Sequence, residues 1–182
     1  MVSFSLYSFD VTGYDRTHQM NRSKCTSRSQ AVEKYGAIDF SSRHWPDQNQ
    51  WLKMFEVPKG FFPDWKVMET DLPCTHFMLN LDAHYPMLNA LESVHNLGLG
   101  HLLHTFDGCF NIRMVRGTNN MFSAHSYGLA IDINAAENPL GCDHGGFYNY
   151  PEFIKCFTNQ GWDWGGHWVH RKDPMHFSYC WE

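Results

Sequence analysis

Two histidines and two aspartates in the last third of the chain have the types and spacing of a metal-dependent hydrolase. His125 and Asp132 lie in the segment SAHSYGLAID, and Asp173 and His176 are the ends of the segment DPMH. Two imidazoles and a carboxylate can hold one zinc ion, and three protein ligands leave its fourth tetrahedral position to water. Zinc lowers the pKa of such a water from about 15.7 to about 7, and a nearby carboxylate can pass its proton to a leaving amine. The pattern predicts a zinc hydrolase with Asp173 as its acid and base.

Strand alternation is expected to bring the three ligands to one side of a sheet. In residues 129–134 (LAIDIN) apolar and polar side chains alternate, so Asp132 points away from the apolar face. In residues 175–181 (MHFSYCW) the same rule sends His176 to the face opposite the aromatic side chains. Gly128 stands between His125 and the first of these strands, where it lets the chain turn back toward Asp132. We therefore expect the ligands to converge.

These motifs resemble those of a known family. The pattern S-x-H-x-x-G-x-A-x-D, followed by an acid three residues before a histidine, is similar to that of the zinc D-alanyl-D-alanine carboxypeptidases and L-alanyl-D-glutamate endopeptidases of bacteria and their phages, which have the hedgehog/D,D-peptidase fold. The resemblance covers roughly residues 80 to 182. It implies that His125, Asp132 and His176 are the zinc ligands and that Asp173 is the general base and acid.

The resemblance also suggests residues that act on the substrate. Residues 110–117 (FNIRMVRG) resemble the arginine-bearing strand of the family, which implies that Arg113 or Arg116 polarises the scissile carbonyl and stabilises its oxyanion. Alternation puts the two arginines on opposite faces, so only one of them should reach the zinc. The segment Trp164-Gly-Gly-His-Trp168 matches a tryptophan-glycine segment of the family. Ser123, Trp164 and Trp168 are the candidate substrate contacts.

Three further histidines could offer an alternative ligand. His167 stands between the two main motifs, and His144 and His170 lie in neighbouring segments that read as loops. The other interpretation is that all three are surface loop histidines that titrate near neutrality.

Length and composition favour a single enzyme domain. The chain has 182 residues, 43% of them hydrophobic, which suits one core and is short for two domains. A net charge of −5 without a run of Lys or Arg argues against a nucleic-acid partner. No apolar run reaches the roughly 18 residues of a membrane span, and the first residues lack the features of a secretory signal peptide. The six cysteines form no C-x-x-C pair and are expected as free thiols, with disulfides as the alternative if the protein works outside the cell.

The chain divides into an N-terminal extension, residues 1–28, and a single zinc peptidase domain, residues 29–182. Most of the aromatic side chains should pack in its core. The expected fold is α+β, with helices packed on a small antiparallel sheet that carries the zinc.

Several helices and turns follow from local signals. A helix over residues 29–35 should be capped by Ser29 and end at Gly36. A second helix begins near Asp82 and closes at Gly98; its face is Leu81, Tyr85, Leu88, Leu91 and His95, with Pro86 in the first turn. A third helix over residues 150–160 should turn Phe153, Ile154 and Phe157 inward. Asp107-Gly108 reads as a tight turn that leads into the arginine-bearing strand, and residues 139–149 as a loop.

The expected function is hydrolysis of amide bonds in the peptidoglycan stem peptide by a zinc-dependent L-alanyl-D-glutamate endopeptidase of a phage. The enzyme would be a monomer that is made in the host cytoplasm without a signal peptide, released by a holin, and active on the cell wall. Two alternatives stay open. One is a D-alanyl-D-alanine carboxypeptidase, and the other is a zinc-containing binding module without turnover, as in hedgehog-type signalling domains.

Overall fold

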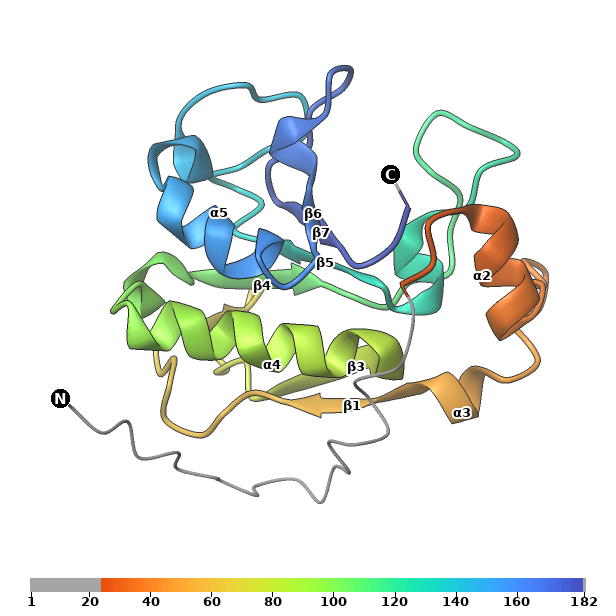
Figure 1. Ribbon diagram of the computed structural model, residues 1–182, viewed down its shortest axis with the longest axis horizontal. Helices are drawn as coiled ribbons and strands as arrows, with labels where there is room; N and C mark the ends of the chain where they lie inside the picture. Colours follow the sequence, from red (N-terminus) through yellow and green to blue (C-terminus); the bar gives the residue numbers. More distant parts are fainter. Residues whose placement is uncertain (1–23, 182) are drawn as a thin grey trace, which may run out of the picture.

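The computed structural model describes residues 24–181 and has the expected α+β fold (Figure 1). Its main helices are α2 (Arg28–Tyr35), α3 (Gln48–Trp51), α4 (Leu81–Asn96) and α5 (Pro151–Thr158), and four short 3₁₀ helices join them: η1 (Gly100–Leu102), η2 (Ala124–Tyr127), η3 (Gly146–Asn149) and η4 (Gly165–His167). The strands are β1 (Leu52–Glu56), β2 (Lys66–Val67), β3 (His76–Asn80), β4 (Thr105–Gly108), β5 (Ala130–Ile133), β6 (Asp163–Trp164) and β7 (His176–Ser178).

The strands form two sheets. The larger has the order β2-β4-β5-β7-β6, and the smaller is the antiparallel pair β1-β3. Within the larger sheet β4, β5, β7 and β6 are antiparallel neighbours, whereas β2 runs parallel to β4 at one edge. The predicted antiparallel sheet is therefore confirmed for its central strands, and its β2 edge makes it a mixed sheet.

One face of the larger sheet is buried by aromatic packing. Phe177 in β7 lies 4.6 Å from Phe157 of α5, measured between ring centroids, and Phe147 and Phe153 pack around it. Helix α5 contacts α4, and α4 also contacts the smaller sheet below it in Figure 1. The prediction that most aromatic side chains belong to the core is confirmed, because Trp45, Trp65, Trp162 and many Phe and Tyr side chains are buried.

The third predicted helix is confirmed as α5. Pro151 occupies its start, where a missing backbone N–H does no harm. Phe153, Ile154 and Phe157 are buried, as their spacing predicts. Residues 139–149 contain η3 and are otherwise irregular.

The first helix begins earlier than predicted. The side chain of Ser27, not Ser29, caps α2 by accepting a hydrogen bond from the backbone N–H of Gln30. Gly36 ends the helix as expected, with a φ of 93°.

Most of the predicted N-terminal extension, residues 1–23, lies outside the described residues. Its last residues pack on the domain. The Lys24 ammonium forms an ion pair with Asp163 at the edge strand β6, and the Cys25 side chain is 4% exposed.

Helix α4 is present but presents another face to the core. Its buried apolar residues are Ala83, Met87, Ala90, Leu91 and Val94, so of the predicted face only Leu91 is buried. Pro86 lies in the second turn rather than the first, where it removes the hydrogen bond that a residue at this position would donate to Asp82. The predicted face was wrong because α4 is covered on two sides, by α5 and by the smaller sheet.

The predicted arginine-bearing strand is also wrong. Residues 110–117 are irregular, and their one β-type pairing is an isolated antiparallel bridge between Met114 and Phe122. Asp107 and Gly108, predicted as a tight turn, belong to β4.

No helix among residues 24–181 combines the length and apolar character that a membrane crossing requires.

Candidate metal centre

The side chains of His125, Asp132 and His176 meet at one point, as the sequence predicted. His125 Nε2 lies 3.2 Å from His176 Nδ1, and Asp132 Oδ1 lies 2.9 Å from His176 Nδ1 and 3.3 Å from His125 Nε2. Ligand atoms around tetrahedral zinc, with bonds of about 2.0–2.1 Å, are about 3.3 Å apart. The three atoms are therefore spaced as the ligands of one zinc ion would be.

Strand register explains the meeting of two of these side chains. Asp132 in β5 and His176 in β7 are directly opposite partners of an antiparallel pair, so their side chains leave the sheet on the same face. That face is the reverse of the one on which Phe177 packs against α5.

The third side chain comes from η2. Gly128 ends this short helix with a φ of 66°, and an added Cβ would lie 2.6 Å from the Leu52 side chain. Glycine suits this position because it adopts a positive φ easily and has no Cβ to collide with Leu52. The turn at Gly128 brings the side chain of His125 close to that of Asp132.

A backbone carbonyl fixes the tautomer of His125. Its Nδ1 lies 2.5 Å from the carbonyl oxygen of Cys109. Because a carbonyl oxygen can only accept a hydrogen bond, Nδ1 must carry the proton and act as the donor. Nε2 is then left with a lone pair that faces the other two ligand atoms. This is how metal-binding histidines are oriented in proteins, and the donor set present fits zinc.

The centre is closed on most sides. His125 is 2% exposed and His176 5%, whereas the Asp132 side chain is 20% exposed. Within residues 24–181 no fourth His, Cys, Asp or Glu joins the three. An open position of the kind that catalytic zinc sites keep is therefore compatible with this arrangement.

Electrostatics favour the ionised form of Asp132. Burial alone would raise the pKa of its carboxyl, but His125 and His176 outweigh burial and hold that pKa well below its ordinary value. A carboxyl group that stays ionised is available to a cation over a wide pH range.

Asp173 lies beside the three side chains in a different environment. Burial raises the pKa of its carboxyl, and the charges of His176, Asp132 and His125 all act on it. Its Oδ1 is buried and has no hydrogen-bond partner within the described residues. A partly desolvated carboxyl group of this kind is suited to proton transfer.

Gly165 of the tryptophan-glycine segment lets the chain pass close to the backbone of Asp173. A Cβ on Gly165 would lie 2.4 Å from the Asp173 carbonyl oxygen, and one on Gly166 would lie 2.3 Å from the Trp164 ring. The Asp173 N–H donates to the Gly165 carbonyl at 3.0 Å. Only a chain without side chains at these two positions can approach so closely.

The three candidate substrate contacts differ in their surroundings. Trp164 is 4% exposed and its Nε1 donates to the Pro174 carbonyl, and Ser123 is 5% exposed and caps η2 at the His125 N–H. Trp168 is half-buried, with its ring centroid 5.4 Å from that of His176. Trp168 and Trp164 line a cavity of about 530 Å³ together with Lys24, Thr158, Gly161, Trp162, Asp163 and His167.

The two candidate arginines are separated. Arg113 is half-buried, and its backbone N–H and carbonyl both bond the Ser126 hydroxyl. Arg116 is exposed, and its charge acts on Asp173. Arg171 donates to the Arg116 carbonyl and so joins the Arg116 loop to the segment before Asp173.

The three other histidines lie apart from the centre. His144, His167 and His170 are exposed, and none belongs to the metal-binding group. His144 pairs with Asp143, and the His167 ring packs edge-on against Trp164. All three lie at the surface, His144 and His170 in irregular segments and His167 at the end of η4.

Sequence reasoning missed the contribution of the main chain. The Cys109 carbonyl that orients His125 has no side-chain signal, and neither do the two backbone groups of residue 113 that bond Ser126. Ser126 lies inside the first motif, and its position there is the one signal that could have singled it out.

An α+β domain with a convergent His-Asp-His group and a half-buried acid beside it has the features of a metal-dependent hydrolase. The model of a family described as D-alanyl-D-alanine carboxypeptidase matches residues 116–179. This stretch contains all four of these residues, and the match indicates a metallopeptidase. No curated protein and no solved structure matches the chain.

Proposed function

We propose that the protein is a zinc-dependent peptidoglycan peptidase in which His125, Asp132 and His176 hold the metal. One observation carries the proposal: three ligand atoms at tetrahedral spacing lie within the stretch that matches a carboxypeptidase family. Zinc bound there would supply a water of lowered pKa and polarise the scissile carbonyl.

Asp173 is the proposed general base and acid. Its raised pKa brings the carboxyl group closer to the operating pH, where it can both take a proton and return it. It accepts the proton of the attacking water and then donates it to the nitrogen of the leaving amine, so the carboxylate is regenerated.

Arg116 is the proposed electrophilic residue. Two observations favour it over Arg113: its charge acts on Asp173, and it lies within the matched stretch, which begins at this residue. A guanidinium group stays charged at all working pH values and can stabilise the oxyanion of the tetrahedral intermediate.

Trp168 is the proposed substrate contact, because it is half-buried with its ring beside that of His176. Burial favours another role for the other two candidates. Trp164 supports the Asp173–His176 turn through its bond to Pro174, and Ser123 supports His125 by capping η2.

The proposed reaction is cleavage of the L-alanyl-D-glutamate bond by a phage lytic enzyme. An enzyme that opens the cell wall must break the stem peptide itself, and removal of a terminal residue leaves the cross-linked wall intact. In this proposal the chain acts as a monomer, is made in the host cytoplasm and reaches the wall with the help of a holin.

The second candidate is a D-alanyl-D-alanine carboxypeptidase, which the description of the matched family favours. Digestion of purified peptidoglycan by the zinc-loaded protein, followed by mass spectrometry of the fragments, separates the two. New N-terminal D-glutamate identifies the endopeptidase, and free D-alanine identifies the carboxypeptidase. Neither product, from a protein that holds one zinc, would contradict both and leave a binding module.

A further inference from the structure

Strand β4 carries one extra residue where it passes the metal centre. Phe106 pairs with Ile133 and Gly108 pairs with Asp132, so two steps along β4 correspond to one step along β5. Asp107 is the extra residue. Such β-bulges shift the register of everything beyond them, and they are frequent next to functional sites.

The register beyond the bulge decides where the Cys109 carbonyl stands. Cys109 directly follows Gly108, and its carbonyl oxygen accepts a hydrogen bond from the Nδ1–H of His125. Without the extra residue, Cys109 would move along β5 by one position, about 3.3 Å, and successive strand positions point to opposite sides. The carbonyl would then no longer face His125.

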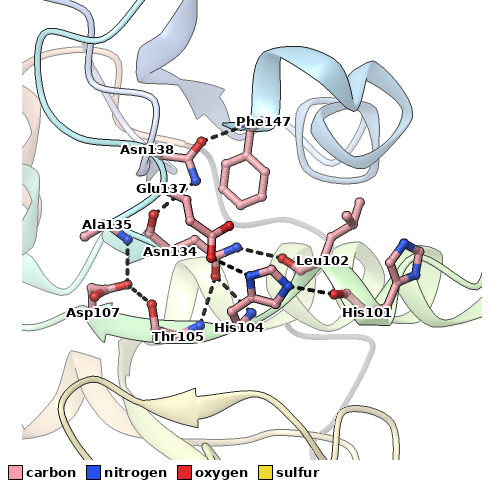
Figure 2. Close-up of polar contacts among 10 residues, drawn as sticks. All are labelled: His101, Leu102, His104, Thr105, Asp107, Asn134, Ala135, Glu137, Asn138 and Phe147. Carbon is pink, nitrogen blue, oxygen red and sulfur yellow. Dashed lines mark hydrogen bonds and ion pairs between the residues drawn. The ribbon is translucent and has the colours of Figure 1, made fainter. Parts of the chain in front are cut away.

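The side chain of Asp107 holds this bulge in place. Its Oδ2 accepts hydrogen bonds from the Thr105 hydroxyl at 2.7 Å and from the Ala135 N–H at 3.0 Å (Figure 2). One donor lies on β4 itself and the other on the chain just after β5. The carboxylate thus ties the two strands together at the point where their register changes.

A buried asparagine fixes the same two strands from the other side. Asn134 is 2% exposed; its Oδ1 accepts from the backbone N–H groups of His104 and Thr105, and its Nδ2 donates to the Leu102 carbonyl (Figure 2). Asn134 directly follows β5 and has a φ of 53°. Asparagine tolerates this left-handed conformation better than most residues do. Asn134 and Asp107 therefore both join the first part of β4 to the chain at the end of β5.

We propose that Asp107 is a positioning residue for the metal centre: by fixing the β4 bulge it sets the Cys109 carbonyl against His125 and so orients the His125 ring toward Asp132 and His176. The inference rests on the zinc site of the proposed function. The hydrogen bonds of Asp107 go to Thr105 and Ala135 and not to the three ligands. Its effect on His125 is therefore transmitted through the backbone of β4 and Cys109.

Zinc affinity, measured by competition with a chromogenic chelator, tests this role without any assay of activity. Asp107→Ala removes both hydrogen bonds and should weaken zinc binding by about 10- to 100-fold, the usual effect of losing a residue that orients a ligand. Asp107→Asn keeps an oxygen acceptor and should restore affinity close to wild type. The d–d absorption of the cobalt-substituted protein should change in Asp107→Ala alone, because it reports ligand geometry.

Glu137→Ala is the matched control, since it removes a neighbouring carboxylate that bonds only His104 in the same network (Figure 2). It should leave zinc affinity unchanged. Equal zinc affinities of Asp107→Ala and wild type would overturn the inference. It would also be overturned if Asp107→Asn lost as much zinc affinity as Asp107→Ala, because the charge of Asp107 and not the bulge would then be responsible.

If Asp107→Ala does not fold, Thr105→Val removes one of the two bonds and should weaken zinc binding to a smaller extent; wild-type affinity in that variant would overturn the inference. A wild-type protein that binds no zinc would instead overturn the proposed metal centre, and the inference with it.

Discussion

At the scale of single residues, Asp173 differs from Asp132 although the two carboxyl groups share one site. Imidazoles lower the pKa of Asp132, whereas burial raises that of Asp173. Two acids whose pKa values are driven apart can take different roles, one as a permanent ligand and one as a proton carrier.

Replacement of Asp173 by asparagine should separate catalysis from metal binding. We expect hydrolysis of peptidoglycan to fall by about 10²- to 10⁴-fold, the usual contribution of general acid–base catalysis, while zinc stays near one per chain. The base must be deprotonated, so wild-type kcat/KM should rise with pH through a pKa above the ordinary value of about 3.9. Full activity of Asp173→Asn would remove this residue from the mechanism.

Asp173 should also reduce the stability of the metal-free protein. Because its pKa is raised in the folded state, the folded state binds more protons between the two pKa values, and stability falls as pH rises through that window. We expect Asp173→Asn to have a higher Tm than wild type at neutral pH in the presence of a chelator, and the difference to vanish in acid. A difference that is the same at both pH values would contradict this assignment.

His125 and His167 provide a direct comparison of a buried and an exposed imidazole. His125→Ala should lose zinc and part of its stability, because metal-binding energy contributes to folding energy. His167→Ala should retain both, since its ring is exposed and lies outside the metal-binding group. Zinc content by atomic absorption and Tm by calorimetry check the pair, and the reverse pattern would make His167 the ligand.

At the scale of elements, the close contact between η4 and the segment before β7 positions Asp173. Gly165→Ala would place a Cβ against the Asp173 backbone, and we expect a loss of stability of about 1–3 kcal/mol together with a loss of hydrolysis. Gly100→Ala is the control, because its Cβ would meet the Phe62 ring at 3.0 Å and no backbone atom closer than the Phe61 carbonyl oxygen at 3.7 Å. Urea unfolding measures both variants, and equal effects would show that backbone contact is not decisive.

At the scale of the whole molecule, the cysteines report how completely the core is closed. Five of the six thiols are buried and Cys142 is partly exposed, and burial raises the pKa of Cys74 to about 12. Ellman's reagent should therefore modify about one thiol rapidly in the native protein and all six after denaturation. Fewer than six in denaturant would indicate disulfides, and rapid reaction of all six in the native state would show that the core opens.

The sequence by itself determined the elements whose signals are local. Strict alternation predicted that Asp132 and His176 leave β5 and β7 on one face, and the spacing of Phe153, Ile154 and Phe157 predicted that they are buried in α5. The candidate metal ligands could be named because imidazole and carboxylate groups keep their chemistry wherever the chain places them.

Only the tertiary structure decided what depends on contacts between distant segments. The face of α4 is set by two neighbours at once, residues 110–117 lie outside the sheet, and the orientation of His125 depends on the carbonyl of Cys109, which directly follows β4. The bulge at Asp107 could not be predicted locally, because it depends on pairing with β5 and on a hydrogen bond from the Ala135 N–H beyond that strand. Side-chain periodicity indicates on which face of a strand or helix a side chain lies. The register between two strands depends on their pairing, and the sequence of one segment alone does not determine that pairing.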